Sequence, residues 1–308
     1  MNKIECFKVR LFETELENKF DMKLYHEIKT IKCDNFGLIP RYTKSIMADP
    51  FLFVKGNVLY LFYESKKLFK NATIEMISTN DLKRWSAPVT VLSESIHLSY
   101  PFVFEHENNV YMIPETSALK TINLYKAQNK DLTNFEFHKT ILTDNNDYTD
   151  GEFSFSDSSI LENNGRFYLQ TSVLKNGKNI LKMYHSDFFD GPYYEAKYSP
   201  LLTDNRCGRN AGCNLVIDGT KYRFAQDCEV RYGDNVNVYR IETLSSDEYK
   251  ENLVIKGLYS AGIRFYKEGG HHFNCVDFLG KRIIATDAKE YHYYIVPRII
   301  NKIVKKEI

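Results

Sequence analysis

Hydrophobic and polar positions alternate along much of this chain, and one arrangement of them returns five times. Each copy holds a short apolar strand, a tight turn rich in Gly and Asn, and a second strand rich in aromatic residues. The copies cover residues 47–64, 99–115, 155–172, 210–227 and, more weakly, 270–287. Their first strands start at Asp49, Tyr100, Asp157, Ala211 and His271, which are separated by 51, 57, 54 and 60 residues. Strand repeats with a period of about 50 residues predict a propeller with one sheet for each repeat.

The period extends beyond these hairpins, because another pair of predicted strands follows each of the first four. The segments that carry them cover residues 73–85, 122–135, 181–193 and 238–249. We therefore predict an all-β protein, a five-bladed β-propeller with four-stranded blades. The blades are expected at residues 45–95, 97–145, 150–203, 207–257 and 262–290. The fifth is too short for four strands, so the N-terminal segment, through residues 8–12 or 24–31, is expected to close the ring and cover its open edge.

The C-terminal residues depart from this pattern. Ile295, Ile299 and Ile303 recur at a spacing of four, and Lys and Arg side chains lie off this apolar stripe, which predicts a short amphipathic helix. A basic amphipathic helix can lie on an anionic membrane surface. Alternatively, the stripe packs on the propeller or on a second subunit. The expected organisation is an N-terminal segment that closes the ring (1–44), the propeller (45–290) and the helix (291–308).

Composition narrows the class of protein. The formal net charge is +1, so no overall field would attract nucleic acid. No apolar leader segment opens the chain, and no run of about 18 apolar residues occurs. We therefore expect a cytoplasmic protein that associates with the inner face of the plasma membrane through residues 291–308. The six cysteines show no C-x-x-C spacing and no glycine-rich nucleotide motif is present, so neither a metal nor a cofactor is predicted.

Polar residues gather at the strand ends that a propeller directs toward one mouth of its central channel. The first strands start at the five positions given above, and the second strands end at Glu64, Glu115, Ser172, Asp227 and Asp287. Paired carboxylates at such a mouth suit glycosyl chemistry, in which one group acts as base or nucleophile and another as acid. The catalytic candidates are Asp49, Glu115 and Asp157; the substrate-binding candidates here are Glu64, Tyr100, Asp227 and His271. Alternatively, Asp49 caps the turn at Pro50 and Asp157 bonds its own backbone.

Arginine and histidine residues add further candidates. Arg209 and Arg231 could hold a phosphate, since a guanidinium fork matches phosphate geometry; the alternative is a surface salt bridge for each. His271 and His272 are adjacent, and strand alternation predicts that only one of them, His271, reaches the mouth.

Several motifs together resemble a known family. They are ADPFLF (48–53), LSYPFVF (98–104), IPETS (113–117), AQDC followed by RYG (225–233), and the Gly269, His271, Asn274 set. Across residues 40–290 the chain resembles the N-terminal domain of plant glucosamine inositolphosphorylceramide transferases, whose stand-alone bacterial relatives occur among surface-polysaccharide genes. That domain is similar to five-bladed propellers of family 43 glycoside hydrolases and invertases.

The resemblance has implications for the site. It implies that Asp49 matches the base or nucleophile of those hydrolases, whereas Tyr100 stands where they have an orienting Asp. Asp157 falls at the strand start in blade three, where their acid is a Glu in a different local setting. In the plant enzymes another domain carries the transferase chemistry.

Together, these observations favour a carbohydrate-active enzyme of surface-polysaccharide assembly. We expect a glycosyltransferase that takes a sugar, with a furanose as one candidate, from an activated donor (a sugar phosphate or nucleotide sugar) to a glycan or lipid-linked acceptor. The alternatives are a glycoside hydrolase of the family 43 type and a non-catalytic glycan-binding propeller.

Overall fold

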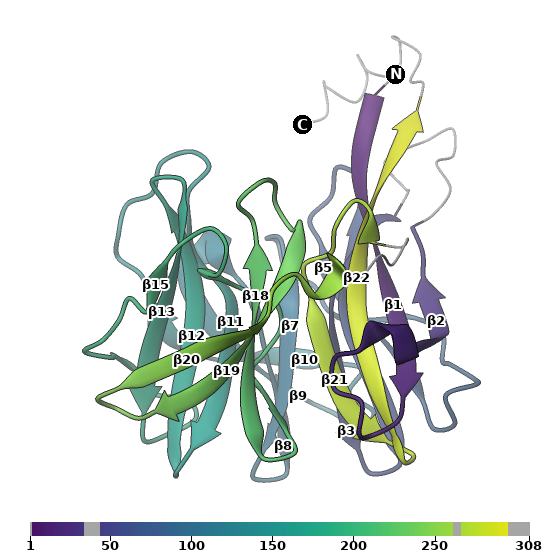
Figure 1. Cartoon of the computed structure of the whole chain (residues 1–308), viewed down its shortest axis with the longest axis horizontal. Helices are drawn as coiled ribbons and strands as arrows, with labels where there is room; N and C mark the ends of the chain where they lie inside the picture. The colour runs from purple at the N-terminus through teal and green to yellow at the C-terminus, as the bar shows by residue number, and fades with distance from the viewer. Residues whose placement is uncertain (1, 34–43, 261–265, 295–308) are drawn as a thin grey trace.

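The protein is built almost entirely from β-strands (Figure 1). The computed structural model describes residues 2–33, 44–260 and 266–294. Helical structure in these ranges is limited to short 3-10 segments, which include η1 (Met22–Leu24), η3 (Ser117–Leu119) and η4 (Leu258–Ser260). No helix in these ranges is long and apolar enough to cross a membrane. The all-β class expected from the sequence is confirmed.

Strands that follow one another in sequence pair in antiparallel sheets. One sheet contains β7 (Ser99–His106), β8 (Asn109–Glu115), β9 (Thr121–Ala127) and β10 (Phe135–Thr143). The next contains β11 (Phe153–Asn163), β12 (Arg166–Lys175), β13 (Lys178–Ser186), β14 (Tyr194–Glu195) and β15 (Leu202–Thr203). A further sheet contains β16 (Arg209–Asn210), β17 (Leu215–Ile217), β18 (Thr220–Asp227), β19 (Asn235–Leu244) and β20 (Tyr249–Ile255).

The remaining sheet joins the two ends of the chain. It contains β1 (Asn2–Thr14), β2 (His26–Ile31), β3 (Lys44–Lys55), β4 (Val58–Lys67), β5 (Thr73–Thr79), β6 (Val89–Leu92), β21 (Phe273–Phe278) and β22 (Lys281–Tyr294). β1 pairs antiparallel with β22 along its whole length, and β2 pairs with β1. This group meets the β3–β6 group through parallel pairing of Phe7 with Ile46. Within the described ranges no sheet closes on itself.

The structure shifts one predicted boundary. β22 continues to Tyr294, so residues 291–294, expected at the start of the C-terminal helix, are a strand that pairs with the beginning of β1. Residues 295–308, with the isoleucine stripe, lie outside the described residues.

The predicted hairpins are present, with one interruption. Four of them are β3–β4, β7–β8, β11–β12 and β21–β22. In the fourth copy along the chain the first strand is split into β16 and β17, which both pair with β18. The break lies at Gly212, where φ is +113° and an added Cβ would lie 2.0 Å from the carbonyl oxygen of Phe273. The neighbouring chain therefore approaches the backbone at a point where only glycine leaves room.

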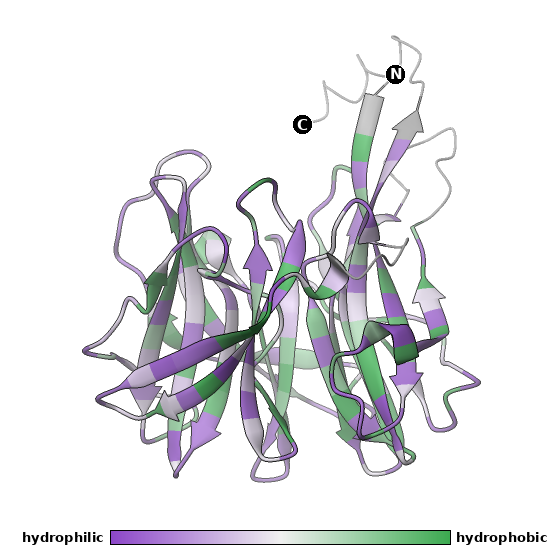
Figure 2. Ribbon diagram, viewed as in Figure 1, coloured by the Kyte–Doolittle hydropathy of each residue, from purple (hydrophilic) through white to green (hydrophobic). Residues whose placement is uncertain are grey.

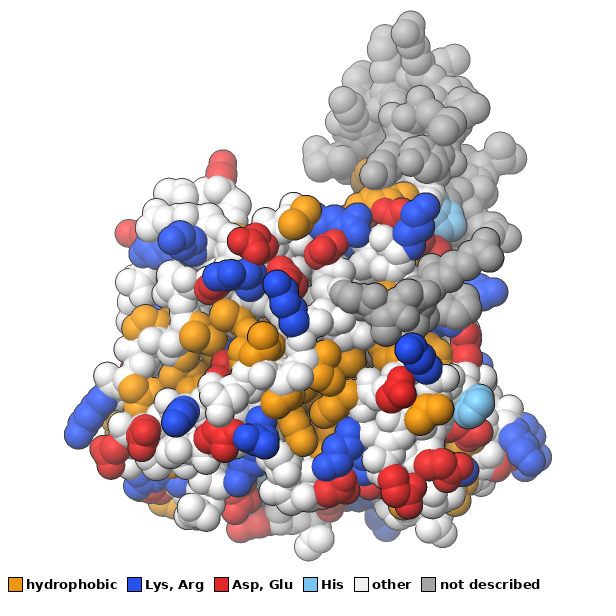
Figure 3. All heavy atoms as spheres, viewed as in Figure 1, with side chains coloured by type: hydrophobic (Ala, Val, Ile, Leu, Met, Phe, Trp, Pro, Cys, Tyr) orange, Lys and Arg blue, Asp and Glu red, His pale blue; other side chains and the backbone are white. Residues whose placement is uncertain are grey.

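Apolar side chains fill the spaces between neighbouring sheets. One cluster joins Phe51 of β3, Phe102 of β7, Phe155 of β11 and Leu169 of β12, which come from three different sheets. Hydrophobic residues lie mainly on the strands, while most connecting turns are hydrophilic (Figure 2). On the face shown in Figure 3, acidic and basic side chains are mixed, as expected for a net charge of +1. The apolar core therefore packs neighbouring sheets against one another, and the polar candidate residues lie at the strand ends.

Candidate active site

Three candidate residues share an unusual backbone conformation. Asp49, Tyr100 and Asp157 have φ values of 50°, 47° and 53°, a left-handed region that non-glycine residues rarely occupy. Near each of them the register with the following strand shifts, which indicates a β-bulge. A bulge re-aims the side chain out of the regular alternation of the strand. The same local strain thus recurs at the start of three hairpins, as strain often does at functional positions.

Carboxylates from the strand ends bind the backbone at these strained positions. The N–H of Asp49 donates to Asp287 Oδ2 (3.3 Å), the N–H of Tyr100 to Asp49 Oδ2 (3.2 Å) and the N–H of Asp157 to Glu115 Oε2 (3.3 Å). Residues that lie far apart in the sequence are therefore neighbours, in two hydrogen-bonded groups: Asp287, Asp49 and Tyr100 in one, and Glu115 and Asp157 in the other. The charge of Asp49, which adds to burial in raising the pKa of Glu115 and of Asp157, links the two groups into one electrostatic network. The expected gathering of strand ends is present for this set.

Asp49 lies at the centre of a charged cluster. Its Oδ1 is 3.8 Å from Nδ1 of His271 and 3.5 Å from Nδ1 of His272. Burial alone would raise the pKa of Asp49, but the hydrogen bond from His272 and the charges of both imidazoles lower it to about 2. The Asp49 carboxylate is therefore ionised at neutral pH, although it is almost fully buried.

His271 is paired on its other side with Asp287. Its Nδ1 lies 2.5 Å from Asp287 Oδ2, and its ring stacks on Phe7 with centroids 4.6 Å apart. Burial lowers the pKa of His271, but the charge of Asp287 outweighs it and brings that pKa to about 9. The imidazolium form, present at neutral pH, balances one of the two carboxylates beside it.

Asp157 and Glu115 form the other half of the network. Asp157 Oδ2 accepts from Nε of Arg209 (2.6 Å), whose guanidinium carbon lies 5.0 Å from the ring centroids of Phe153 and Tyr232. Burial raises the pKa of Asp157 despite the opposing charge of Arg209. Burial and the nearby Asp157 charge together raise the pKa of Glu115 to about 8. At neutral pH Glu115 therefore carries a proton, whereas Asp49 does not.

Other candidates lie in different settings. Glu64 is buried and pairs with His97 (Oε1 to Nε2, 3.2 Å); burial raises its pKa against the effect of the histidine. The carboxylate of Asp227 accepts from the N–H of Glu229 within its own turn. Arg231 bonds Asp234 and Glu268, and its side chain is 38% exposed. For Arg231 the structure therefore has the surface salt bridge that the sequence left open as the alternative.

Tyr100 is fully buried, and its hydroxyl accepts the N–H of Gly212 (3.0 Å). Its ring meets Phe51 and His272 edge to face. In this setting Tyr100 supports the backbone of another sheet, which is a positioning role.

The prediction that only one of the two adjacent histidines reaches the site is wrong. Both side chains come within 4 Å of Asp49 Oδ1. The residues precede β21, so strand alternation does not apply to them, and the N–H groups of both donate to Asp287 Oδ1 (2.8 and 3.1 Å). Asp287 and His272 are thus the residues that sequence reasoning missed. Asp287 had a signal, its alignment with Glu64 and Glu115 at a second-strand end, but nothing in the sequence marked the contacts of His272.

The same cluster offers ligands for a metal ion. One atom from each of Asp49, His271 and Asp287 lies within 4.8 Å of the others, and all three residues are buried. The sequence predicted no metal, because these ligands come from distant strands and show no local spacing. In the present geometry the close approach of His271 to Asp287 is that of an ion pair, which balances one of the two carboxylates.

Comparison with known proteins assigns the chain to a family. Residues 30–277 match the family model described as "Glucosamine inositolphosphorylceramide transferase 1, N-terminal". The chain belongs to this family. The curated glucosamine inositolphosphorylceramide transferase 1 of Oryza sativa subsp. japonica is 34% identical over 259 residues, which cover 81% of this chain and 32% of the relative. The Arabidopsis thaliana transferase of the same name is 34% identical over 217 residues, which cover 67% and 27%.

The chain therefore spans about a third of the length of these transferase relatives. Solved structures show the fold alone. A GH32 beta-fructofuranosidase of Bombyx mori has a TM-score of 0.57 at 16% identity, covering 78% of this chain and 54% of its own. A family 117 glycoside hydrolase of Zobellia galactanivorans has a TM-score of 0.54 at 10% identity, covering 83% and 91%. The fold of this family member is a β-propeller like that of GH43 proteins.

The predicted location is wrong. The curated relatives are plant enzymes whose name identifies an inositolphosphorylceramide, a sphingolipid, and this finding contradicts a cytoplasmic protein at the inner face of the plasma membrane. The error arose because the prediction relied on the lack of a leader segment. A sequence that spans a third of its relatives carries no information on that point.

Proposed function

We propose that this member of the glucosamine inositolphosphorylceramide transferase N-terminal family acts in glycosyl transfer, moving a sugar from an activated donor to a hydroxyl group of a glycolipid acceptor. The family match and the names of the relatives support this class of reaction. The observation that carries it is the placement of two buried strand-end carboxyl groups in different surroundings: Asp49 lies beside His271 and His272 and is ionised, whereas Glu115 lies beside Asp157 and is protonated. Environments that drive two pKa values apart assign the base and the acid.

The finer architecture belongs to the same proposal. We infer five blades, with β3–β6, β7–β10, β11–β15, β16–β20 and the β21, β22, β1, β2 group as one blade each. The pairing of β1 with β22 supports closure of the ring by the N-terminal segment. The propeller would then occupy residues 44–294 together with β1 and β2, and residues 295–308 follow it in the sequence.

Each residue of the network has a role in this reaction. Asp49 accepts the proton of the acceptor hydroxyl as its oxygen forms a bond to the anomeric carbon. The bond from that carbon to the donor oxygen breaks, and Glu115 supplies a proton to the departing group. Arg209, whose Nε is fixed by Asp157, offers its remaining N–H groups to the donor phosphate. His272 and His271 together keep Asp49 ionised.

The test is an assay of the full chain against a panel of sugar phosphates and nucleotide sugars, with glycolipid acceptors. Transfer that needs both donor and acceptor is expected. Release of reducing sugar from glycosides without a donor would show a hydrolase instead, and glycan binding without turnover across the panel would show a binding module. A furanose as the sugar and surface polysaccharide as the product remain predictions that the same panel examines.

The pH dependence of transfer follows from Glu115. Its carboxyl group must hold a proton to act as the acid, and its pKa is raised to about 8, so activity should persist below pH 8 and be lost above it. Rates should fall about tenfold for each further pH unit. The measurement is kcat/KM across this pH range. In Glu115→Gln the residual rate should lose this alkaline limb; an unchanged limb in that variant would assign it to another group.

A further inference from the structure

A basic turn with an exposed aromatic residue projects from the same strand ends as the site. β4 passes Glu64 and ends at Lys67, and the turn that follows carries Leu68, Phe69 and Lys70. Phe69 is 48% exposed and has a φ of 61°. A left-handed conformation is costly for a bulky residue. The fold thus holds a Phe side chain at the surface at some expense of backbone strain.

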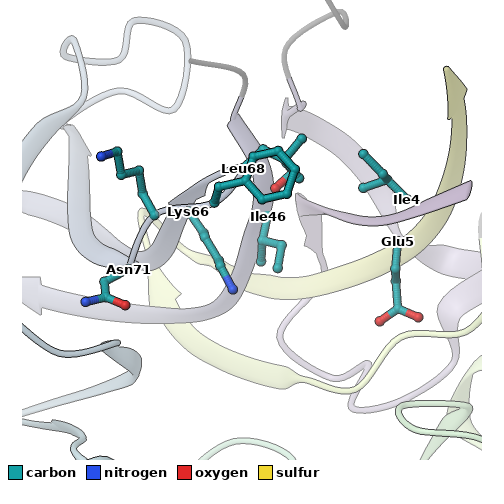
Figure 4. A pocket seen from close by; sticks show the side chains of 9 residues that line it. Ile4, Glu5, Ile46, Lys66, Leu68 and Asn71 are labelled. Carbon is teal, nitrogen blue, oxygen red and sulfur yellow. The ribbon is translucent and has the colours of Figure 1, made fainter. Parts of the chain in front are cut away.

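A cavity opens beside this turn. It has a volume of about 610 Å³, in the range of sites that bind small molecules. Its apolar lining comes from Ile4, Ile46, Leu68 and Phe69, that is from β1, β3 and the turn. In Figure 4, Leu68, Ile46 and Ile4 lie along the cavity and Lys66 extends beside them. The wall is therefore apolar with a cationic border.

Charge at the turn is of one sign. In the described part of the chain, Lys66, Lys67 and Lys70 form no ion pair, and Glu5 is the single acidic residue that lines the cavity. Glu5 is itself 3.3 Å from Nζ of Lys289, which neutralises it. Three ammonium groups without an ion-pair partner thus surround the apolar side chains of Leu68 and Phe69. This arrangement is complementary to a membrane surface, which has anionic headgroups outside and apolar acyl chains beneath them.

We propose that this turn, residues 66–70, docks on an anionic membrane surface and that the cavity beside it receives part of a lipid. The lysines bind the headgroup phosphates, while Phe69 and Leu68 enter the boundary with the acyl chains. Glu64 lies two residues before Lys66 and pairs with Ala48, the neighbour of Asp49, so docking brings this side of the candidate site toward the membrane surface. The proposed docking is argued from the charge and exposure of this turn. It rests on the proposed function only in taking the acceptor to be a lipid.

The test is sedimentation of the full chain with vesicles of phosphatidylcholine alone and of equal parts phosphatidylcholine and phosphatidylserine. Binding to the anionic vesicles is expected, weakening with added salt. The double variant Lys66→Gln/Lys70→Gln should bind them about 30-fold more weakly, from a loss of about fivefold for each lysine. Phe69→Ser should lose about tenfold or more.

Matched controls are Lys197→Gln and Phe188→Ser, whose side chains are also highly exposed but lie elsewhere. They should bind as the unchanged chain does. Equal affinity of the turn variants and the unchanged chain, equal losses in the controls, or absence of any preference for anionic vesicles would overturn the proposal. Transfer to a water-soluble acceptor should be unaffected in the turn variants. If no transfer occurs at all, the proposed function fails while the vesicle result still decides the docking.

Discussion

Replacing Asp49 with asparagine should lower the rate of glycosyl transfer by about 100- to 10,000-fold, the usual contribution of a general base. The amide keeps the size of the side chain and an oxygen that can accept the N–H of Tyr100, which bonds Asp49 Oδ2 in the native protein. It has no negative charge, so it cannot take the acceptor proton or balance the imidazolium of His271. Steady-state rates with saturating donor and acceptor measure the effect.

The control is Asp277→Asn. The Asp277 carboxylate lies on β21, the strand that follows His271 and His272; its side chain is 58% exposed and bonds Arg282. It should leave the rate within a factor of about two. Urea denaturation of both variants, followed by circular dichroism, separates a loss of chemistry from a loss of folding. Full turnover in both Asp49→Asn and Asp157→Asn would remove the carboxylate network from the mechanism.

Replacing Arg223 with methionine should lower the free energy of unfolding by about 3–5 kcal/mol, the cost of leaving a buried charge without its partner. The Arg223 side chain is fully buried and forms two hydrogen bonds to Glu251, at 2.6 and 2.7 Å, across β18, β19 and β20. A third bond goes to the carbonyl oxygen of Cys207 (3.0 Å). Without the guanidinium, Glu251 keeps, among the described residues, only the hydrogen bond from the Tyr249 hydroxyl. Urea denaturation followed by circular dichroism gives the free energy.

Two comparisons isolate this buried pair. Arg166→Met breaks an exposed pair with Asp187 and should cost less than about 1 kcal/mol. The double variant Arg223→Met/Glu251→Gln should recover part of the loss, because no unpaired charge then remains in the sheet. A loss in Arg223→Met no larger than that in Arg166→Met would contradict the expectation.

The hairpins were predictable because each is a local feature. The turn between β3 and β4 holds Gly56, with a φ of 60°, between two strands whose apolar residues face the core. The split of the fourth copy was not predictable in this way. It depends on the approach of Phe273 to Gly212, two positions 61 residues apart, and a local pattern carries no record of that contact.

The candidate site was likewise predictable only in part. Spacing placed Asp49, Glu115 and Asp157 at equivalent strand ends. In the structure Glu115 accepts the backbone N–H of Asp157, whereas Asp49 accepts the N–H of Tyr100 and donates its own to Asp287. Spacing also placed Asp227 there, yet its carboxylate binds its own turn. Equivalent positions in a repeat thus share a backbone location, while the direction of each side chain depends on what the neighbouring sheet presents.

By itself, the order of residues determined that this chain forms successive antiparallel hairpins whose polar ends come together, because alternation and turn chemistry act over a few residues. Only the tertiary structure decided the charge states there. Asp49 and Asp157 are the same residue type at equivalent positions, yet the pKa of one is lowered and that of the other is raised. The difference lies in the buried imidazoles of His271 and His272 beside Asp49, since electrostatic energy depends on distances that folding alone sets.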